Sequence, residues 1–68
     1  MDIEWVRRRL GAGMPVRAQS HPATDAWIFG DRFGDVATAG RTKIRVKMDR
    51  SGRVRTFHPA DLEEVVMD

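Results

Sequence analysis

Thr42-Lys43-Ile44-Arg45-Val46-Lys47-Met48 is the most regular stretch of this sequence, because apolar and polar side chains alternate along it without interruption. A strict period of two is typical of a β-strand with one face in a core and the other in solvent. The stretch therefore predicts a strand whose Ile, Val and Met side chains are buried and whose Lys and Arg side chains face outward.

A hairpin is expected directly after this strand. Asp49-Arg50-Ser51-Gly52 is typical of a tight turn, with glycine where a positive φ is favoured, and residues 53–57 continue as a second strand. If Asp49 pairs with Arg53 across a three-residue loop, this pair fixes which residues of the two strands lie opposite each other. On the outer side that register pairs Lys47 with Arg55, and Arg45 with Phe57. Phe57 is then exposed; the alternative is burial of Phe57 under the N-terminal segment.

The residues after the hairpin predict a single helical turn and a last strand. The turn covers residues 58–62, where Pro59 suits the first helical position and Asp61 lies where the helix dipole favours an anion. The last strand is expected over residues 64–67. This order places a 3₁₀-like turn immediately before the final strand.

The residues before the hairpin predict a helix followed by short strands. Residues 2–10 fit a helix capped by Asp2 and ended by Gly11, although a segment this short frays unless it packs on something. A strand over residues 14–18 should lie at a sheet edge or begin at Pro15, which cannot donate a ladder hydrogen bond. We further expect a loop over 20–25, a strand over 26–29, a glycine-framed turn over 30–35 and a strand over 36–39.

These segments are six candidates for the strands of the sheet, and we expect five of them to form it. The fold class is then mainly β: a small five-stranded antiparallel barrel with a short N-terminal helix. We divide the chain into an N-terminal helix with a glycine linker over residues 1–13 and the barrel over residues 14–68. A chain of 68 residues makes one small domain. Closure into a barrel leaves no exposed sheet edges. This matters in a small domain, which has few other elements to cover such edges.

Several of these segments resemble the SH3-like barrels, including Tudor-like and KOW-like domains. The resemblance is carried by Gly34-Asp35-Val36, by Val46-Lys47-Met48-Asp49 with Gly52, and by the run from Phe57 to Glu63. Domains of this family often end with one 3₁₀ turn carrying Asp-Leu before the last strand. The spacing is also similar to that of small actinobacterial SH3-like domains of unknown function, and the resemblance covers roughly residues 14–67. The chain has no tyrosine, whereas peptide-binding SH3 domains use tyrosine-rich grooves, so recognition of proline-rich peptides is not expected.

Charge is unevenly distributed along the chain. The total is 12 basic and 10 acidic residues, yet residues 41–55 hold seven Arg and Lys against Asp49 alone. Residues 56–68 hold four acids and no Arg or Lys. The segment over 41–55 has two interpretations: a solvated strand face, or a basic surface that meets an anionic partner. Arginine outnumbers lysine ten to two, which suits phosphate contacts and equally reflects a GC-rich genome.

The sequence offers little for catalysis, metal binding or membrane insertion. It has no cysteine, and its two histidines, His21 and His58, have no second ligand at helical or hairpin spacing. No apolar run approaches the roughly 18 residues of a membrane span, and no signal-peptide pattern follows the N-terminus. We therefore expect a cytoplasmic protein that is not an enzyme, binds no cofactor or metal and does not associate with membranes.

Binding is the function that remains, with two candidate partners. One is nucleic acid, DNA or RNA, held by the basic hairpin 41–57. The other is a protein partner with an acidic surface, which includes assembly with further copies of this chain through its own acidic end. In the first case the basic side chains contact phosphates and the aromatic ring stacks on a base. The candidate binding residues are Lys43, Arg45, Lys47, Arg53, Arg55 and Phe57.

Overall fold

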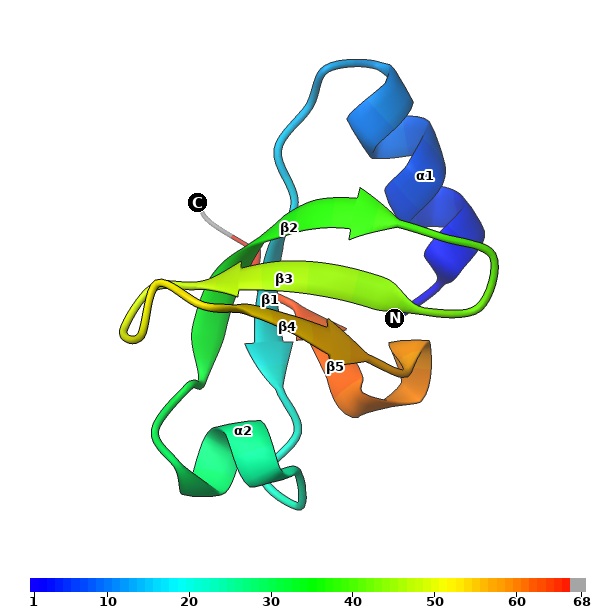
Figure 1. Cartoon of the computed structure of the whole chain (residues 1–68). Helices are drawn as coiled ribbons and strands as arrows, with labels where there is room; N and C mark the ends of the chain where they lie inside the picture. Colours follow the sequence, from blue (N-terminus) through cyan, green and yellow to red (C-terminus); the bar gives the residue numbers. More distant parts are fainter. Residues whose placement is uncertain (67–68) are drawn as a thin grey trace.

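The computed structural model describes residues 1–66 and is mainly β (Figure 1). Five strands form one antiparallel sheet in the order β4-β3-β2-β1-β5. In chain order the elements are α1 (Ile3–Gly11), β1 (Arg17–Ser20), α2 (Asp25–Ile28), β2 (Phe33–Ala39), β3 (Ile44–Met48), β4 (Val54–Phe57), the 3₁₀ turn η1 (Pro59–Asp61) and β5 (Leu62–Glu64). The predicted strand number, the N-terminal helix and the 3₁₀ turn before the last strand are confirmed.

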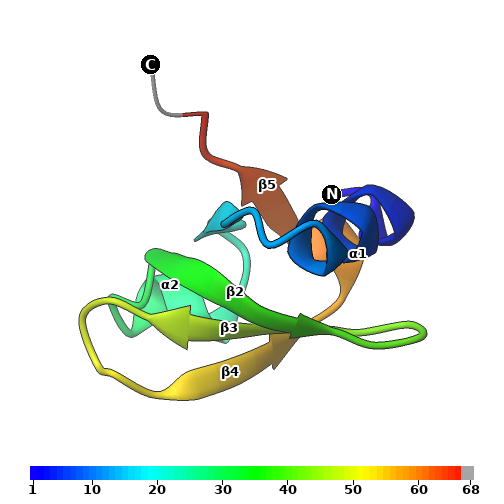
Figure 2. The ribbon, with the colours of Figure 1, turned by 90° about the horizontal axis from the view of Figure 1, so that it is seen from above.

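The sheet is open, so the prediction of a closed barrel is wrong. β4 and β5 are the two edges of the sheet and do not pair with each other. Figure 2 shows β2, β3 and β4 together in one layer, with β5 and α1 on the opposite side. The backbone nitrogen of Met1 donates hydrogen bonds to the carbonyl oxygens of Pro59 (2.8 Å) and Leu62 (3.0 Å). This contact occupies the edge of β5 that a closed barrel would have paired with β4.

Helix α1 forms where the sequence predicts it and packs on the sheet instead of fraying. The carboxylate of Asp2 accepts hydrogen bonds from two backbone N–H groups of the first turn, which have no partner inside the helix. After the last turn the chain reverses at Gly13, whose φ of 75° is available to glycine without strain. Val6 is fully buried, and its burial stabilises a helix too short to persist alone.

The core lies between the sheet and the two helices, and each helix and strand contributes to it. The alternation of residues 42–48 is confirmed, because the apolar members of β3 are all buried and the basic members are all exposed. The buried apolar residues are Val6, Val16, Ala18, Ala26, Val36, Ile44, Val46, Met48, Phe57 and Leu62.

The expected strand over residues 26–29 is wrong, because the chain forms helix α2 there. A run of four apolar residues fits a short helix as well as a strand, and the residues before it decide the outcome. The Thr24 hydroxyl accepts a hydrogen bond from the backbone N–H of Trp27 (3.3 Å), so Thr24 caps the helix. The helix buries Ala26 and leaves Ile28 and Phe29 in solvent.

Three strands differ in extent from the prediction. β1 begins at Arg17, two residues after Pro15, and lies inside the sheet between β2 and β5 instead of at an edge. β2 begins at Phe33 and includes Gly34, which had been assigned to a turn. β5 ends at Glu64, so the predicted strand over 64–67 is shifted toward the N-terminus; its last residue, Met67, lies outside the described residues.

The register of the β3–β4 hairpin differs by one residue from the predicted register. The backbone N–H of Met48 donates to the carbonyl oxygen of Arg53 (2.8 Å), so these two residues flank a four-residue loop over 49–52. The loop has one residue more than expected, and a shift of one residue turns every side chain of β4 to the opposite face. The observed pairs are Ile44 with Phe57, Arg45 with Thr56, Val46 with Arg55, and Lys47 with Val54.

Candidate nucleic-acid interface

Strand β3 and the residue before it carry three of the predicted binding residues. Lys43 immediately precedes the strand, and Arg45 and Lys47 lie within it; all three side chains are exposed. Arg45 and Lys47 point away from the core because they alternate with the buried apolar members of the strand, whereas Lys43, just before the strand, also lines the groove on the inner side of β4. None of the three forms a salt bridge with any other residue in the range 1–66. Within residues 1–66, the structure therefore presents two cations without a salt bridge on the outer face of β3, which we call the basic row, and a third directly before the strand.

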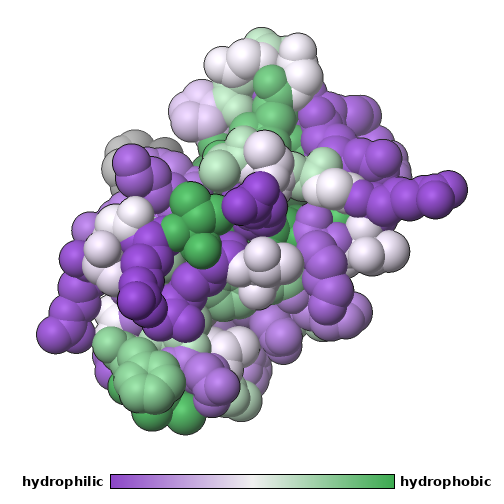
Figure 3. All heavy atoms as spheres, viewed as in Figure 1, coloured by the Kyte–Doolittle hydropathy of each residue, from purple (hydrophilic) through white to green (hydrophobic). Residues whose placement is uncertain are grey.

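The strands beside β3 surround this row with small and polar side chains. Arg45 is paired with Thr38 on β2 and with Thr56 on β4. Lys47 is paired with Asp35 on β2 and with Val54 on β4, so the predicted contact of Lys47 with Arg55 is wrong. The unfavourable pairing of two like charges that the sequence implied is therefore absent at this position. Figure 3 shows hydrophilic side chains over much of this face, with hydrophobic atoms between them.

Asp35 and Asp49 lie near the basic row, and one arginine contacts both of them. The guanidinium of Arg17 on β1 contacts Asp49 through two nitrogens (2.9 and 2.7 Å) and Asp35 at 3.2 Å. The Arg17 hydrogen bonds hold the pKa of Asp49 below its usual value. Arg17 compensates one of these two negative charges, so Lys47 has the carboxylate of Asp35 beside it, whereas Arg45 lies between Thr38 and Thr56.

Arg55 does not belong to this face, in contrast to the prediction. Its side chain points to the inner side of the sheet, where Nε donates to Oδ2 of Asp31 at 2.6 Å. Asp31 is only 3% exposed and also accepts a hydrogen bond from the Ser51 hydroxyl (2.9 Å). Hydrogen bonds from Arg55 and Ser51 outweigh the effect of burial and lower the pKa of Asp31. Arg55 is thus committed to an internal ion pair.

Phe57 is also on the inner side and is 6% exposed, so it cannot stack on a ligand. Arg53 is exposed beside the turn, where its backbone N–H donates to the Ser51 hydroxyl (3.2 Å). The structure therefore brings together Arg45 and Lys47 on the outer face, with Lys43 just before the strand and Arg53 at the end of the same hairpin, and it places Arg55 and Phe57 on the inner side. Arg41 and Arg50 are exposed as well.

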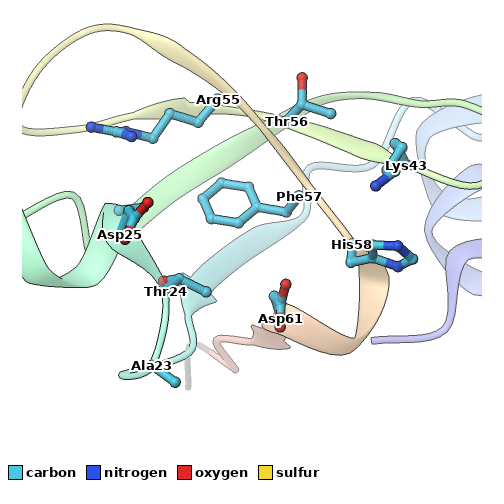
Figure 4. Close-up of a pocket in the computed structure, with 10 residues that line it drawn as sticks. Ala23, Thr24, Asp25, Lys43, Arg55, Thr56, Phe57, His58 and Asp61 are labelled. Carbon is cyan, nitrogen blue, oxygen red and sulfur yellow. The ribbon is translucent and has the colours of Figure 1, made fainter.

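A groove with a volume of about 570 Å³ lies on the inner side of β4, between this strand, η1 and the segment that enters α2. Figure 4 shows the ring of Phe57 directed into the space between Arg55 and the residues before α2. The charged side chains of the lining are of both signs, namely Lys43, Arg55, Asp25 and Asp61. A groove of mixed charge does not select an anion, so we place the candidate interface on the outer face.

Phe33 is not among the predicted binding residues, yet it is 42% exposed at the start of β2. The residues 30–35 were assigned to a turn because two glycines frame them. A usable signal was present, since residues 33–36 alternate between larger exposed side chains and small or apolar buried ones. Reading Gly34 as a tightly packed strand residue would have extended β2 and placed Phe33 on the outer face.

Other classes of site are not evident in the described part of the chain. Within residues 1–66, no three His, Asp or Glu side chains gather as they would around a metal ion. No helix among these residues has the length and hydrophobicity needed to cross a membrane. Comparison of the chain with protein-family models, curated proteins and solved structures yields no match.

Proposed function

We propose that this chain is a non-catalytic module that binds the phosphate backbone of nucleic acids on the outer face of β3. The observation that carries the proposal is the pair Arg45 and Lys47 on this face, with Lys43 just before the strand. All three side chains are exposed and form no salt bridge within residues 1–66. Side chains two residues apart on a strand are separated by about 6.8 Å. Each cation of the row can therefore contact a different phosphate.

The fold supports the same class of function. We propose that the five antiparallel strands, with a 3₁₀ turn between β4 and β5, represent an open variant of the SH3-like barrels that the sequence resembles. Such small sheets offer a rigid surface instead of a deep pocket. A strand within a sheet fixes the backbone positions from which its cations project, so only side-chain entropy is lost there when a partner binds.

Binding of this kind is electrostatic and weakens steeply as salt concentration rises. Each phosphate that is neutralised releases condensed counter-ions, and the slope of log K against log salt reports the number of phosphates engaged. Arginine and lysine on a flat surface read no base edges, so we expect little dependence on base sequence.

The test is fluorescence anisotropy of labelled DNA and RNA titrated with the protein at low and at physiological salt. The variant Arg45→Gln/Lys47→Gln should bind at least about tenfold more weakly at low salt, with a slope smaller by about 1.4 to 1.8. The matched control is Arg7→Gln/Arg8→Gln, which removes the same charge from the exposed side of α1. Equal losses in both variants would mean that only net charge matters, and would contradict the proposed face.

A second candidate partner is a protein with an acidic surface, which includes another copy of this chain. Ile28 and Phe29 favour it, because these adjacent side chains are 68% and 72% exposed at the end of α2. The side chain of Arg50 lies against the neighbouring Gly30, so a basic group adjoins this apolar pair. Absence of nucleic-acid binding at low salt would favour this candidate, and light scattering at two salt concentrations would then test self-assembly.

A further inference from the structure

Phe33 lies on the same face of the sheet as the basic row. Gly34, the next residue, pairs with the buried Met48 and therefore belongs to the inner side. Because side chains alternate along a strand, Phe33 and Asp35 belong to the outer side, and Asp35 pairs with Lys47. This register makes Phe33 a diagonal neighbour of Lys47, within reach of a ligand that contacts both.

The ring of Phe33 is 42% exposed, and its neighbour just beyond the end of β3 is Asp49, whose carboxylate is paired with Arg17. The ring belongs to the β2 end nearest the hairpin loop, since the backbone N–H of Asp49 donates to the Phe33 carbonyl oxygen (3.0 Å). Its pairing partner on β1 is the polar residue Gln19. Across β3, Val54 is 47% exposed and adds a second apolar side chain to the same end of the outer face.

The two tryptophans are in a different situation, because each already contacts an arginine of the chain. The guanidinium of Arg32 lies 4.1 Å from the ring centre of Trp27, and that of Arg9 lies 5.3 Å from that of Trp5. Phe57 is buried. Phe33 is thus the aromatic side chain that is exposed on the basic face, and cation–π contacts do not cover it within residues 1–66.

We propose that Phe33 is a platform on which an unpaired base stacks, and that the outer face consequently selects single-stranded over double-stranded nucleic acid. The inference rests on the proposed function and adds the class of partner. Bases in a duplex stack on one another and do not present their faces, whereas bases of a single strand do. A strand whose phosphates lie along Arg45 and Lys47 carries its next base to the position of Phe33.

The experiment uses three short labelled probes: a single strand of thymidines, a duplex of the same length, and an abasic strand that keeps only sugar and phosphate. The wild-type protein should bind the thymidine strand several-fold more tightly than the other two. Phe33→Ala should weaken binding of the thymidine strand about tenfold and leave binding of the abasic strand unchanged. Phe33→Trp should retain or strengthen binding, since its ring is larger.

The matched control is Phe29→Ala, which removes an equally large and even more exposed ring from α2, away from the basic face. It should bind all three probes as the wild type does. Thermal unfolding of each variant confirms that the fold is retained, because both rings contribute little to the core.

The outcomes separate this inference from the proposed function. Equal binding of the thymidine and abasic strands, or an unchanged affinity in Phe33→Ala, would overturn the stacking role. If Arg45→Gln/Lys47→Gln still lost affinity in that case, the phosphate-binding face would stand. Failure of every probe to bind at low salt would overturn both.

Discussion

Neighbouring strands β3 and β4 both carry arginine, yet they place it in opposite environments. Arg45 of β3 projects into solvent between two threonines, Thr38 and Thr56. Arg55 of β4 turns inward and pairs with the buried Asp31. The difference shows that a count of basic residues along a hairpin does not measure the charge that a partner can reach.

The ion pair with Asp31 explains why Arg55 is tolerated on the inner side of the sheet. A guanidinium that leaves water loses solvation, and an anionic partner with good geometry must compensate for that loss. Asp31 provides this partner, and the Ser51 hydroxyl occupies the same carboxylate oxygen. Since Asp31 follows α2 and Ser51 belongs to the hairpin loop, the network ties the segment between α2 and β2 to the β3–β4 hairpin.

The largest expected effect contrasts the two arginines directly. Arg55→Gln should lower the free energy of unfolding by about 3 kcal/mol, because it leaves the carboxylate of Asp31 buried without its cation. Arg45→Gln should change it by less than about 0.5 kcal/mol, as is usual for an exposed position without specific contacts. Urea denaturation followed by tryptophan fluorescence measures both. Similar losses of unfolding free energy in the two variants would show that β3 and β4 do not place their arginines in different environments.

A double variant sharpens this test. Asp31→Asn/Arg55→Gln removes both charges of the pair. It should lower the free energy of unfolding by less than the sum of the losses in the two single variants. The reason is that each single substitution leaves one orphaned charge, and the double variant leaves none. Strict additivity would mean that the two side chains do not interact.

The next effect concerns the close approach of β2 to β3. A Cβ on Gly34 would collide with the carbonyl oxygen of Lys47 and with the side chain of Val46. Gly34→Ala should therefore lower the free energy of unfolding by about 2 kcal/mol, since the backbone has to move. Gly11→Ala is the control, because nothing lies within 4 Å of a Cβ there. Denaturation that leaves Gly34→Ala as stable as Gly11→Ala would contradict the tight packing of β3 on β2.

The smallest expected effect is the dependence of the free energy of unfolding on pH, which comes from Asp31 and is confined to acid. The pKa of Asp31 in the folded protein lies below its ordinary value of 3.8. The folded state therefore binds the proton less tightly than the unfolded state, and the stabilisation is complete well above pH 3.8 and is lost as the pH falls below it. Thermal unfolding across this range should show a steeper acid loss in the wild type than in Asp31→Asn. Parallel curves would rule out a contribution from Asp31.

The elements that local chemistry specifies were predicted correctly. Asp2 caps α1 as expected, and the period-two pattern of β3 identified both its buried and its exposed side chains. Pro59 begins the 3₁₀ turn, where its missing N–H costs nothing. In each case a few adjacent residues carry the whole signal, so no distant contact is needed to interpret it.

The errors arose where two local structures were about equally favourable. Residues 26–29 suit either a strand or a helix, and the cap at Thr24 and the burial of Ala26 favour the helix. The hairpin loop suits three or four residues, and the four-residue loop allows Arg55 to reach Asp31. The one additional loop residue turns Arg55 and Phe57 away from the candidate site, while Lys43, Arg45 and Lys47 remain in it.

By itself the sequence determined a small mainly β domain with an N-terminal helix, and a strand whose basic side chains face solvent, because periodicity and capping act over a few residues. Only the tertiary structure decided the register of β4, the open sheet and the exposure of Phe33. These features depend on partners far away in the chain: Asp31 for Arg55, the N-terminal residue for the edge of β5, and the backbone of β3 for Gly34. Contacts between distant segments leave no periodic trace in either segment, and for that reason they become visible only when the chain is folded.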